Sequence, residues 1–515
     1  MKNKTFFLPI LLYLSPYLLL AQDQLSILIP REDTIATFNI IPRCQDDRIY
    51  LISDAYYAGF FTFNNRYGVV DGFSIEGAHL FRHKIDPTLI QHNQIISPLS
   101  AYAHTSGLLV ASDQTYDFGN DPQSSILWGL DKNGKKLWSR EFNSADGVSL
   151  AGSILEGATA DEVYHFSTRV DNTNGKEYLD VNYLKVDGTM LWSQSHLLPD
   201  WENLDYNYAY TAVKLSDKIV LISDYTPVVA PSSKYMVISI NLDGTLIGFT
   251  DLSSQPAILP FLTRQLSANS FFLIDIDDIG STQSICLNGF NESIDSTAQP
   301  FCAGSFPLQD LLYISDTKTD QAGNVYVAGE YNFPSNHKLG WLSKWSAQGD
   351  LLWQKFYRFS TVFPDGNSSF NGLDFLPNKK GLVLAGTARE NAPPAAGKGY
   401  DWLLTLDENG CFNGDCGDTV SVTATIVSTL EQSDTATQIA IYPNPCKTQF
   451  NLEIKDLTKQ EATLQCFDLT GRMVLRQTVL SGTNPIITNQ LPSGIYIWQI
   501  MDQNSIVGNG RLVKQ

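Results

Sequence analysis

The chain has few residues whose types and spacing point to catalysis. Its seven histidines are scattered between positions 79 and 337, and it holds no G-x-S-x-G, H-E-x-x-H, phosphate-loop or dinucleotide-binding pattern. The 54 Asp and Glu residues leave a pair of carboxylates for glycoside hydrolysis open, since two such acids can come from distant strands. We therefore predict no catalytic residue, no metal and no cofactor, and keep an enzyme as the less favoured class.

The segment 201–210, WENLDYNYAY, is the best candidate for contact with a ligand. Aromatic rings with polar tips suit both sugars and protein surfaces. The four residues concerned are Trp201, Tyr206, Tyr208 and Tyr210. The alternative, and the more common role of such rings, is that they cover the edge of a sheet.

Seven cysteines form a second group with chemistry of its own. Cys411 and Cys416 enclose a short loop that contains glycine, and we expect them to form a disulfide. A zinc site is disfavoured, because this C-x4-C pair lacks neighbouring His or Cys ligands. The other candidate pairs are Cys446 with Cys466 and, more weakly, Cys286 with Cys302, which leaves Cys44 as the odd residue.

Length and charge exclude several classes of function. The chain has 515 residues and a formal net charge of −19, which disfavours binding to nucleic acid. Residues 1–21 combine two lysines, an apolar stretch and a terminal Ala21, as a secretory signal peptide does. No later segment is long enough to span a membrane, so we expect a secreted chain once the signal is removed.

One phrase recurs along residues 40–416 and defines the elements that must position any site. It consists of an apolar strand, a polar turn with glycine and a second strand, and it returns about every 55 residues. Glycine accepts the positive φ of such a turn. The turn glycines are Gly77, Gly134, Gly188, Gly244, Gly289, Gly349 and Gly410.

Each repeat has room for four short strands, because a further apolar strand precedes every turn. Four repeats carry a large ring four residues after the glycine, and we expect these rings to pack between adjacent sheets. They are Phe81, Trp138, Trp192 and Trp353. The fifth repeat is irregular, so six or eight units stay open beside seven.

Radial stacking buries both faces of such sheets and protects their edges. The sequence therefore predicts an all-β fold, with a seven-bladed β-propeller over residues 22–417. The segment 320–330, DQAGNVYVAGE, is similar to the propeller repeats of secreted bacterial proteins. A run of stacked β-sandwiches is the alternative, but it needs roughly 90 to 100 residues per unit.

Residues 418–438 are rich in Ser and Thr and are typical of a linker. Residues 439–515 then hold four short motifs in order. These are Tyr442, Pro443, Asn444 and Pro445; a turn with Asp468 and Gly471; Pro492, Gly494 and Tyr496; and Lys514. In this order they resemble the C-terminal sorting domain of type IX secretion cargo.

That resemblance implies a small Ig-like β-sandwich that is recognised by an outer-membrane translocon and processed by sortase-like machinery. The protein would then be secreted or attached to the outer-membrane surface of a Gram-negative bacterium. The motif residues are expected to shape turns and strands, not to catalyse a reaction.

We therefore predict an exported, non-catalytic propeller that binds a glycan or a protein. The alternatives are a propeller enzyme acting on polysaccharide or a quinone-dependent dehydrogenase. The latter is suggested by LDKNGKKLW (130–138), which is similar to the repeats of those propellers.

Overall fold

The computed structural model describes residues 24–514, and in the described part every regular element is a β-strand. The residues outside the description are 1–23, 31–39, 57–65, 86–93, 117–123, 143–146, 172, 200–203, 228–233, 252–261, 268–269, 280–281, 292–300, 308–310, 334–336, 360–365, 378–380, 390–398, 427–437, 456–460, 469–471, 503–504 and 515. The predicted signal peptide lies among them. No helix that could cross a membrane occurs in the described part of the chain.

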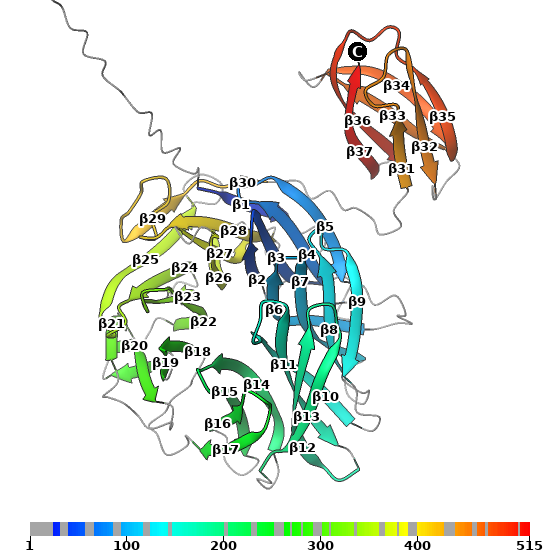
Figure 1. Ribbon diagram of the computed structural model, residues 1–515. Helices are drawn as coiled ribbons and strands as arrows, with labels where there is room; N and C mark the ends of the chain where they lie inside the picture. The colour runs from blue at the N-terminus through cyan, green and yellow to red at the C-terminus, as the bar shows by residue number, and fades with distance from the viewer. Residues whose placement is uncertain are drawn as a thin grey trace, which may run out of the picture.

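Residues 26–407 form seven four-stranded antiparallel sheets arranged as blades around a centre (Figure 1). The first strand of each sheet lies against the first strand of the next, and β26 returns to β2, which closes the ring. The predicted seven-bladed propeller is confirmed. In order from the centre outward the blades are β2 (Ile40–Gln45), β3 (Arg48–Tyr56), β4 (Arg66–Ser74), β5 (His79–Ile85); β6 (Gln94–His104), β7 (Gly107–Tyr116), β8 (Ser124–Asp131), β9 (Lys136–Phe142); β10 (Gly147–Glu156), β11 (Glu162–Asp171), β12 (Lys176–Lys185), β13 (Met190–Leu197); β14 (Leu204–Lys214), β15 (Lys218–Pro227), β16 (Lys234–Asn241), β17 (Leu246–Asp251); β18 (Leu262–Ser267), β19 (Ser270–Ile279), β20 (Thr282–Asn291), β21 (Phe301–Pro307); β22 (Leu311–Thr319), β23 (Val325–Asn332), β24 (Lys338–Trp345), β25 (Leu351–Phe359); and β26 (Asn367–Phe375), β27 (Gly381–Arg389), β28 (Gly399–Asp407), β1 (Ser26–Pro30).

The seventh blade takes its outermost strand from the N-terminal part of the chain. β1 pairs antiparallel with β28, with Ser26 opposite Leu404, and the Trp402 indole N–H donates a hydrogen bond to the Ser26 hydroxyl at 3.1 Å. Pairing of residues from the two ends of the propeller holds the ring closed. The sequence repeats gave no sign of this strand, because the first recognised unit begins near Ile40.

Residues 419–426 then cover the outer edges of the last two blades. β29 (Thr419–Val422) pairs parallel with β25, and β30 (Thr425–Ile426) pairs parallel with β1. Val420 and Val422 are fully buried, and the Lys355 ammonium group donates a hydrogen bond to the carbonyl oxygen of Cys416 at 2.6 Å. This stretch, expected as the start of a linker, thus pairs with the propeller because its valines fill the core beside β25.

The glycine turns adopt the conformation that the repeat predicts. In the second blade the backbone N–H of Gly134 donates to the carbonyl of Asp131 at 2.9 Å, while the Asp131 carboxylate accepts from the amides of Asn133 and Lys135. Gly134 has a φ of 76°. The carboxylate therefore satisfies donors that a tight turn leaves unpaired.

One predicted turn is wrong. Gly289 lies inside β20, opposite Phe272 of β19, and the connection from β20 to β21 falls later in the chain. The short phrase CLNGF resembles the turns of the other blades, but its apolar residues continue a buried strand. The other six predicted turn glycines all have a positive φ, between 69° and 92°.

In the four repeats that carry a large ring after the turn, that ring packs on the turn of the next blade. A Cβ placed on Gly188 would lie 2.8 Å from the ring of Trp138, and one on Gly244 would lie 2.5 Å from the ring of Trp192. Equivalent contacts join Phe81 to Gly134 and Trp353 to Gly410. The expectation that these rings pack between adjacent sheets is confirmed, and each one needs a glycine beneath it.

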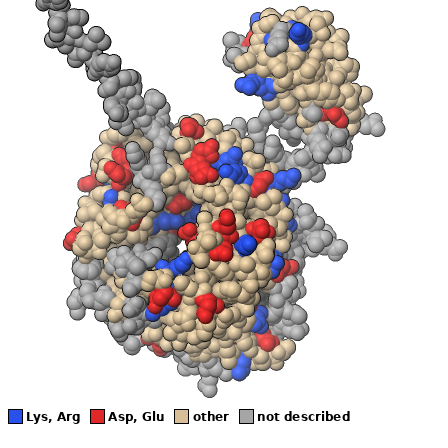
Figure 2. Space-filling view, in the orientation of Figure 1, with Lys and Arg blue, Asp and Glu red and all other residues tan. Residues whose placement is uncertain are grey.

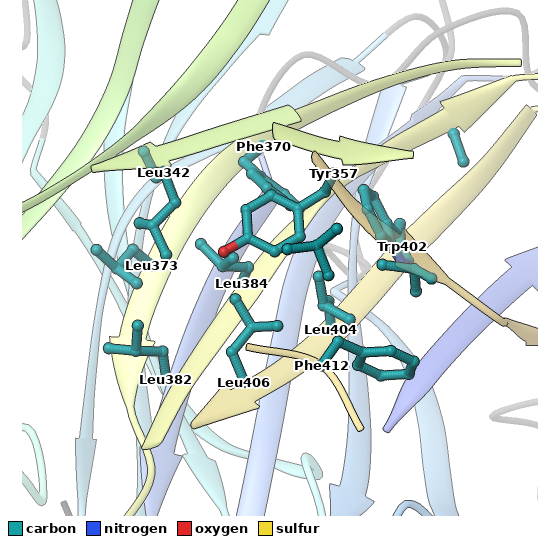
Figure 3. Packing of buried hydrophobic residues seen from close by; sticks show 14 of the residues in the cluster. Leu342, Tyr357, Phe370, Leu373, Leu382, Leu384, Trp402, Leu404, Leu406 and Phe412 are labelled. Atoms are coloured by element: carbon teal, nitrogen blue, oxygen red, sulfur yellow. The ribbon is translucent and has the colours of Figure 1, made fainter. Parts of the chain in front are cut away.

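Apolar side chains fill the spaces between blades, as the sixth and seventh blades illustrate (Figure 3). Phe370 of β26 stacks on Trp402 of β28 with ring centroids 4.9 Å apart. The buried Tyr357 hydroxyl donates to the carbonyl of Gly410 at 2.8 Å, and burial raises the pKa of Tyr357 well above its usual value. Side chains from both sheets therefore form one continuous core.

The C-terminal residues form a separate β-sandwich, whose described strands share no sheet with the propeller. One sheet is β31 (Gln438–Tyr442), β32 (Gln449–Lys455) and β35 (Gly482–Ile487); the other is β34 (Met473–Leu480), β33 (Glu461–Phe467), β36 (Gly494–Asp502) and β37 (Ser505–Lys514). Its core is built from the inward residues of both sheets, including Phe450, Leu464 and Trp498.

Two of the candidate disulfides are present and one is not. Cys411 bonds to Cys416, and Cys286 of β20 bonds to Cys302 of β21 directly across the sheet. The candidate bridge from Cys446 to Cys466 does not form: both are buried free thiols of the sandwich core. The Cys446 sulfur instead lies 3.8 Å from the Thr488 hydroxyl, and burial raises the pKa of Cys466 to about 12.

Candidate functional site

The innermost strands of the seven blades surround the axis of the ring. Figure 2 shows the molecule hollowed at this centre, with Lys and Arg atoms near the hollow. The strands concerned are β2, β6, β10, β14, β18, β22 and β26. We call the hollow that they surround the channel, and these seven strands the channel strands.

Most of these innermost strands carry a β-bulge against their neighbours. The described registers place one in β6, β10, β14, β18, β22 and β26. A bulge re-aims the backbone and the side chains around it. In the sixth blade it brings the Tyr313 carbonyl so close to Gly329 that a Cβ there would lie 1.8 Å from the oxygen. In the seventh blade a Cβ on Gly386 would lie 1.8 Å from the Ser369 carbonyl oxygen, so the bulge requires glycine at both positions.

Tyr313 is an aromatic side chain that remains exposed to solvent on one of these innermost strands. It lies on β22, pairs with Glu330 of β23 and is 46% exposed. Sequence reasoning missed it, because one tyrosine in the apolar strand LLYISD carries no local sign of exposure.

Tyr208 occupies the same register position two blades earlier. It lies on β14 opposite Asp224, two residues before the bulge, as Tyr313 does on β22. Tyr206 and Tyr210 lie on the same innermost strand. The side chains of all three are outside the description, as is Trp201 altogether. Residues 204–210 of the predicted aromatic segment are thus part of the innermost strand of the fourth blade.

At the end of the innermost strands away from Tyr313, charged side chains connect neighbouring blades. Asp374 of β26 lies 3.2 Å from the Lys318 ammonium of β22, and its second oxygen accepts from the backbone N–H of Cys44 at 2.9 Å. The Arg43 guanidinium of β2 donates to the carbonyl of Ala101 on β6 at 2.6 Å. Burial and the Asp374 carboxylate raise the pKa of the Cys44 thiol well above its usual value. These contacts tie four blades together around the axis.

Three of the described histidines are packed into or against the sheets. His79 lies 2.8 Å from the buried Asp71 carboxylate on the neighbouring strand of the first blade, and His196 lies 2.6 Å from the Gly244 carbonyl. His165 is fully buried, and burial lowers its pKa to about 3. Among the described residues, no three His, Cys, Asp or Glu side chains gather as a metal site requires.

In the sandwich, motifs far apart in the sequence meet at one end. The Asn444 side chain donates to the Arg511 carbonyl at 2.8 Å and accepts from the Val513 amide at 2.9 Å. Lys514 pairs with Gly494 in the adjacent strand. The side chain of Asn444 thereby attaches the first motif to the last strand.

The two remaining motifs complete the same end. The Asp468 carboxylate accepts from the backbone N–H and the guanidinium of Arg472, both at 3.1 Å, and closes the hairpin from β33 to β34. The Tyr496 hydroxyl donates to the Pro492 carbonyl at 2.6 Å. Gly471 lies outside the described residues. Tyr442, Pro443 and Pro445 are exposed at this end.

Residues 440–515 match the family model described as a secretion system C-terminal sorting domain. The tail is a type IX sorting domain. It directs the protein through the type IX secretion system to the cell surface or the extracellular space. A comparison with curated proteins finds no match to the chain.

Solved structures similar to this chain include three β-rich proteins. The β-propeller domain of the Trilobed protease from Pyrococcus furiosus is 10% identical, with a TM-score of 0.39 over 74% of this chain and 98% of that one. Trypanosoma rangeli sialidase in complex with the inhibitor DANA is 8% identical, with a TM-score of 0.38 over 94% and 87%. Drosophila Semaphorin 2a is 9% identical, with a TM-score of 0.38 over 93% and 97%. Likenesses this distant say nothing about what the chain binds.

Proposed function

We propose that this protein is a non-catalytic binding module, exported by its sorting domain and displayed on, or released from, the outer membrane. Residues 1–21 serve as the signal peptide, residues 22–417 as the body of the propeller, and residues 439–515 as the tail read by the translocon and its sortase-like partner. The ligand is a glycan or a protein at the cell surface.

The observation that carries the proposal is the repeated tyrosine position on the channel strands. Tyr313 is exposed on β22, and Tyr208 has the same register on β14. Tyrosine contributes a flat apolar face and a hydroxyl group with little conformational entropy to lose, which suits binding to sugars and protein surfaces. The two positions share one register on their strands, and the proposal is that one extended ligand contacts both.

The surroundings of two acids on the channel strands, Asp374 and Asp316, favour a structural role for these carboxylates over hydrolysis. Asp374 is held by Lys318 and a backbone amide, and Asp316 accepts from the Leu373 amide at 2.9 Å. Carboxylates engaged in this way stabilise the junctions between blades. A hydrolase needs two acids placed across a bond, roughly 5 to 10 Å apart.

The test is binding of the full-length secreted chain to a glycan array and to immobilised surface proteins of the same bacterium. Tyr313→Ala and Tyr208→Ala are expected to weaken the binding at least tenfold, about 1.4 kcal/mol for each change. Tyr178→Ala is the matched control, because Tyr178 lies on β12, the third strand of its blade. Its ring packs there on the side chain of Arg169. Turnover of a polysaccharide by the unaltered chain would instead identify an enzyme.

A further inference from the structure

The four-stranded sheet of the sorting domain has an apolar patch on its outer face. Phe467 of β33 pairs with Met473 on one side and with Ile497 on the other, and Ile495 pairs with Val513. Met473, Ile495 and Ile497 are 47%, 40% and 44% exposed. We name these five residues the apolar strip.

The strip lies at the end of the sheet where the sorting motifs meet. The neighbouring residues in strand order, Cys466, Trp498 and Leu512, point into the core. In the middle of the same outer face the side chains are polar, and the Gln499 amide donates to Gln465 at 2.8 Å. At the far end Leu480, opposite Glu461, is 50% exposed and stands apart from the strip. An outer face of an antiparallel sheet is ordinarily polar along its whole length, so a local apolar patch marks an interaction site.

Basic residues surround the strip in a protein that is otherwise strongly acidic. Residues 439–515 contain seven Lys or Arg and five Asp or Glu, although the whole chain has a net charge of −19. Arg511 lies opposite Ile497, Lys514 ends β37, and Lys447 lies in the turn after the first motif. Arg472 follows in the hairpin of the second motif, where it forms an ion pair with Asp468 at 3.1 Å.

We propose that the apolar strip and its basic rim are the surface through which the sorting domain docks on the export machinery. The partner is a protein face with an apolar centre and carboxylates at its border, because that chemistry complements the strip and its rim. A second copy of the sorting domain would bring two basic rims together. The strip adjoins all four motifs, so the docked partner contacts the end of the sandwich that those motifs form.

The experiment uses the full-length chain expressed in a bacterium with a type IX system, and compares the exported fraction with the cell-retained fraction. The double variant Ile495→Thr/Ile497→Thr keeps β-branched side chains and removes most of the apolar surface. Its exported fraction is expected to fall at least tenfold. Ile487→Thr is the matched control, because Ile487 is 62% exposed on the other sheet, and it is expected to export normally.

A charge-reversal variant tests the same surface independently. Arg511→Glu is expected to reduce export, and to weaken the binding of the purified full chain to outer-membrane vesicles from the same bacterium in a salt-dependent way. Thermal unfolding of each variant shows that the tail is folded, and the single variant Ile497→Thr replaces the double variant where the latter is not.

Normal export of a folded strip variant would overturn the proposal. So would a strip variant whose only defect is loss of self-association, measured by sedimentation, or loss of contact with its own propeller. Ligand binding by the propeller is expected to be unchanged in all these variants, which separates this inference from the proposed function.

Discussion

His165 should make the propeller sensitive to mild acid. Its imidazole is fully buried in β11, 4.7 Å from the ring of Phe142, and neither ring nitrogen has a hydrogen-bond partner among the described residues. The adjacent strands place Ile154 and Asn182 opposite it, neither of which carries a charge. Burial therefore lowers the pKa of His165 from 6.5 to about 3.

The magnitude follows from the two pKa values. A group whose folded pKa is depressed in this way favours folding while it is neutral, so its contribution is complete above pH 6.5 and is lost as the pH falls toward 3. At pH 5 the unfolded chain binds a proton at this site and the folded chain does not. The difference lowers the free energy of unfolding by about 2 kcal/mol relative to pH 7.

The assay is urea unfolding of the full chain at pH 7 and pH 5, for the unaltered protein and for His165→Phe. Phenylalanine keeps an aromatic ring beside Phe142 and cannot titrate. Exposed carboxylates with lowered pKa, such as Asp171 and Asp243, occur in both proteins and cancel in the comparison. The unaltered protein should lose about 2 kcal/mol more than the variant over this interval; an equal loss in both would refute the reasoning.

Three further predictions concern the turns, the closure and the tail. Gly188→Ala should lower the stability of the propeller by about 1–3 kcal/mol, because it combines a positive φ with a large ring against the new methyl group. Gly248→Ala is the control: its new Cβ has no atom within 4 Å, so the unfolding midpoint should not change. Cys411→Ser should lower the free energy of unfolding of the propeller by about 2 kcal/mol, because the short loop is no longer closed by a disulfide. Calorimetry should show a lower Tm for the propeller; a Tm equal to that of the unaltered protein would contradict a stabilising role for this disulfide. Asn444→Ala should destabilise the sandwich by about 0.5–1.5 kcal/mol, because the Arg511 carbonyl and the Val513 amide lose their hydrogen bonds to the Asn444 side chain; tail unfolding followed by hydrogen exchange checks this, with Asn489→Ala in an exposed turn as the control.

The features that sequence reasoning predicted are those with a local physical cause. The glycine turns follow from the positive φ they require, and the rings four residues later follow because equivalent positions in a repeat meet equivalent neighbours. Trp138 on Gly188 and Trp353 on Gly410 are examples. The tail was predicted for a different reason, since its motifs are specific enough to be recognised in order.

The features that were missed depend on residues far apart in the chain. β1 has no repeat pattern, and its role appears only when Ser26 meets Leu404. Gly289 was assigned to a turn because its dipeptide is a turn signal, but the pairing of β20 with β19 decides its place. The exposure of Tyr313 is set by the position of β22 at the axis, and alignment of the innermost strands on their bulges is the signal that could have found it.

Hydrogen exchange of the full-length chain, with and without the ligand identified on the array, tests the central claim most directly. If the channel strands bind the ligand, amides in 204–214 and 311–319 are protected when it is present, and the protection is lost in Tyr313→Ala. Protection restricted to outer strands such as β9 and β13, with 204–214 and 311–319 unchanged, would contradict the account.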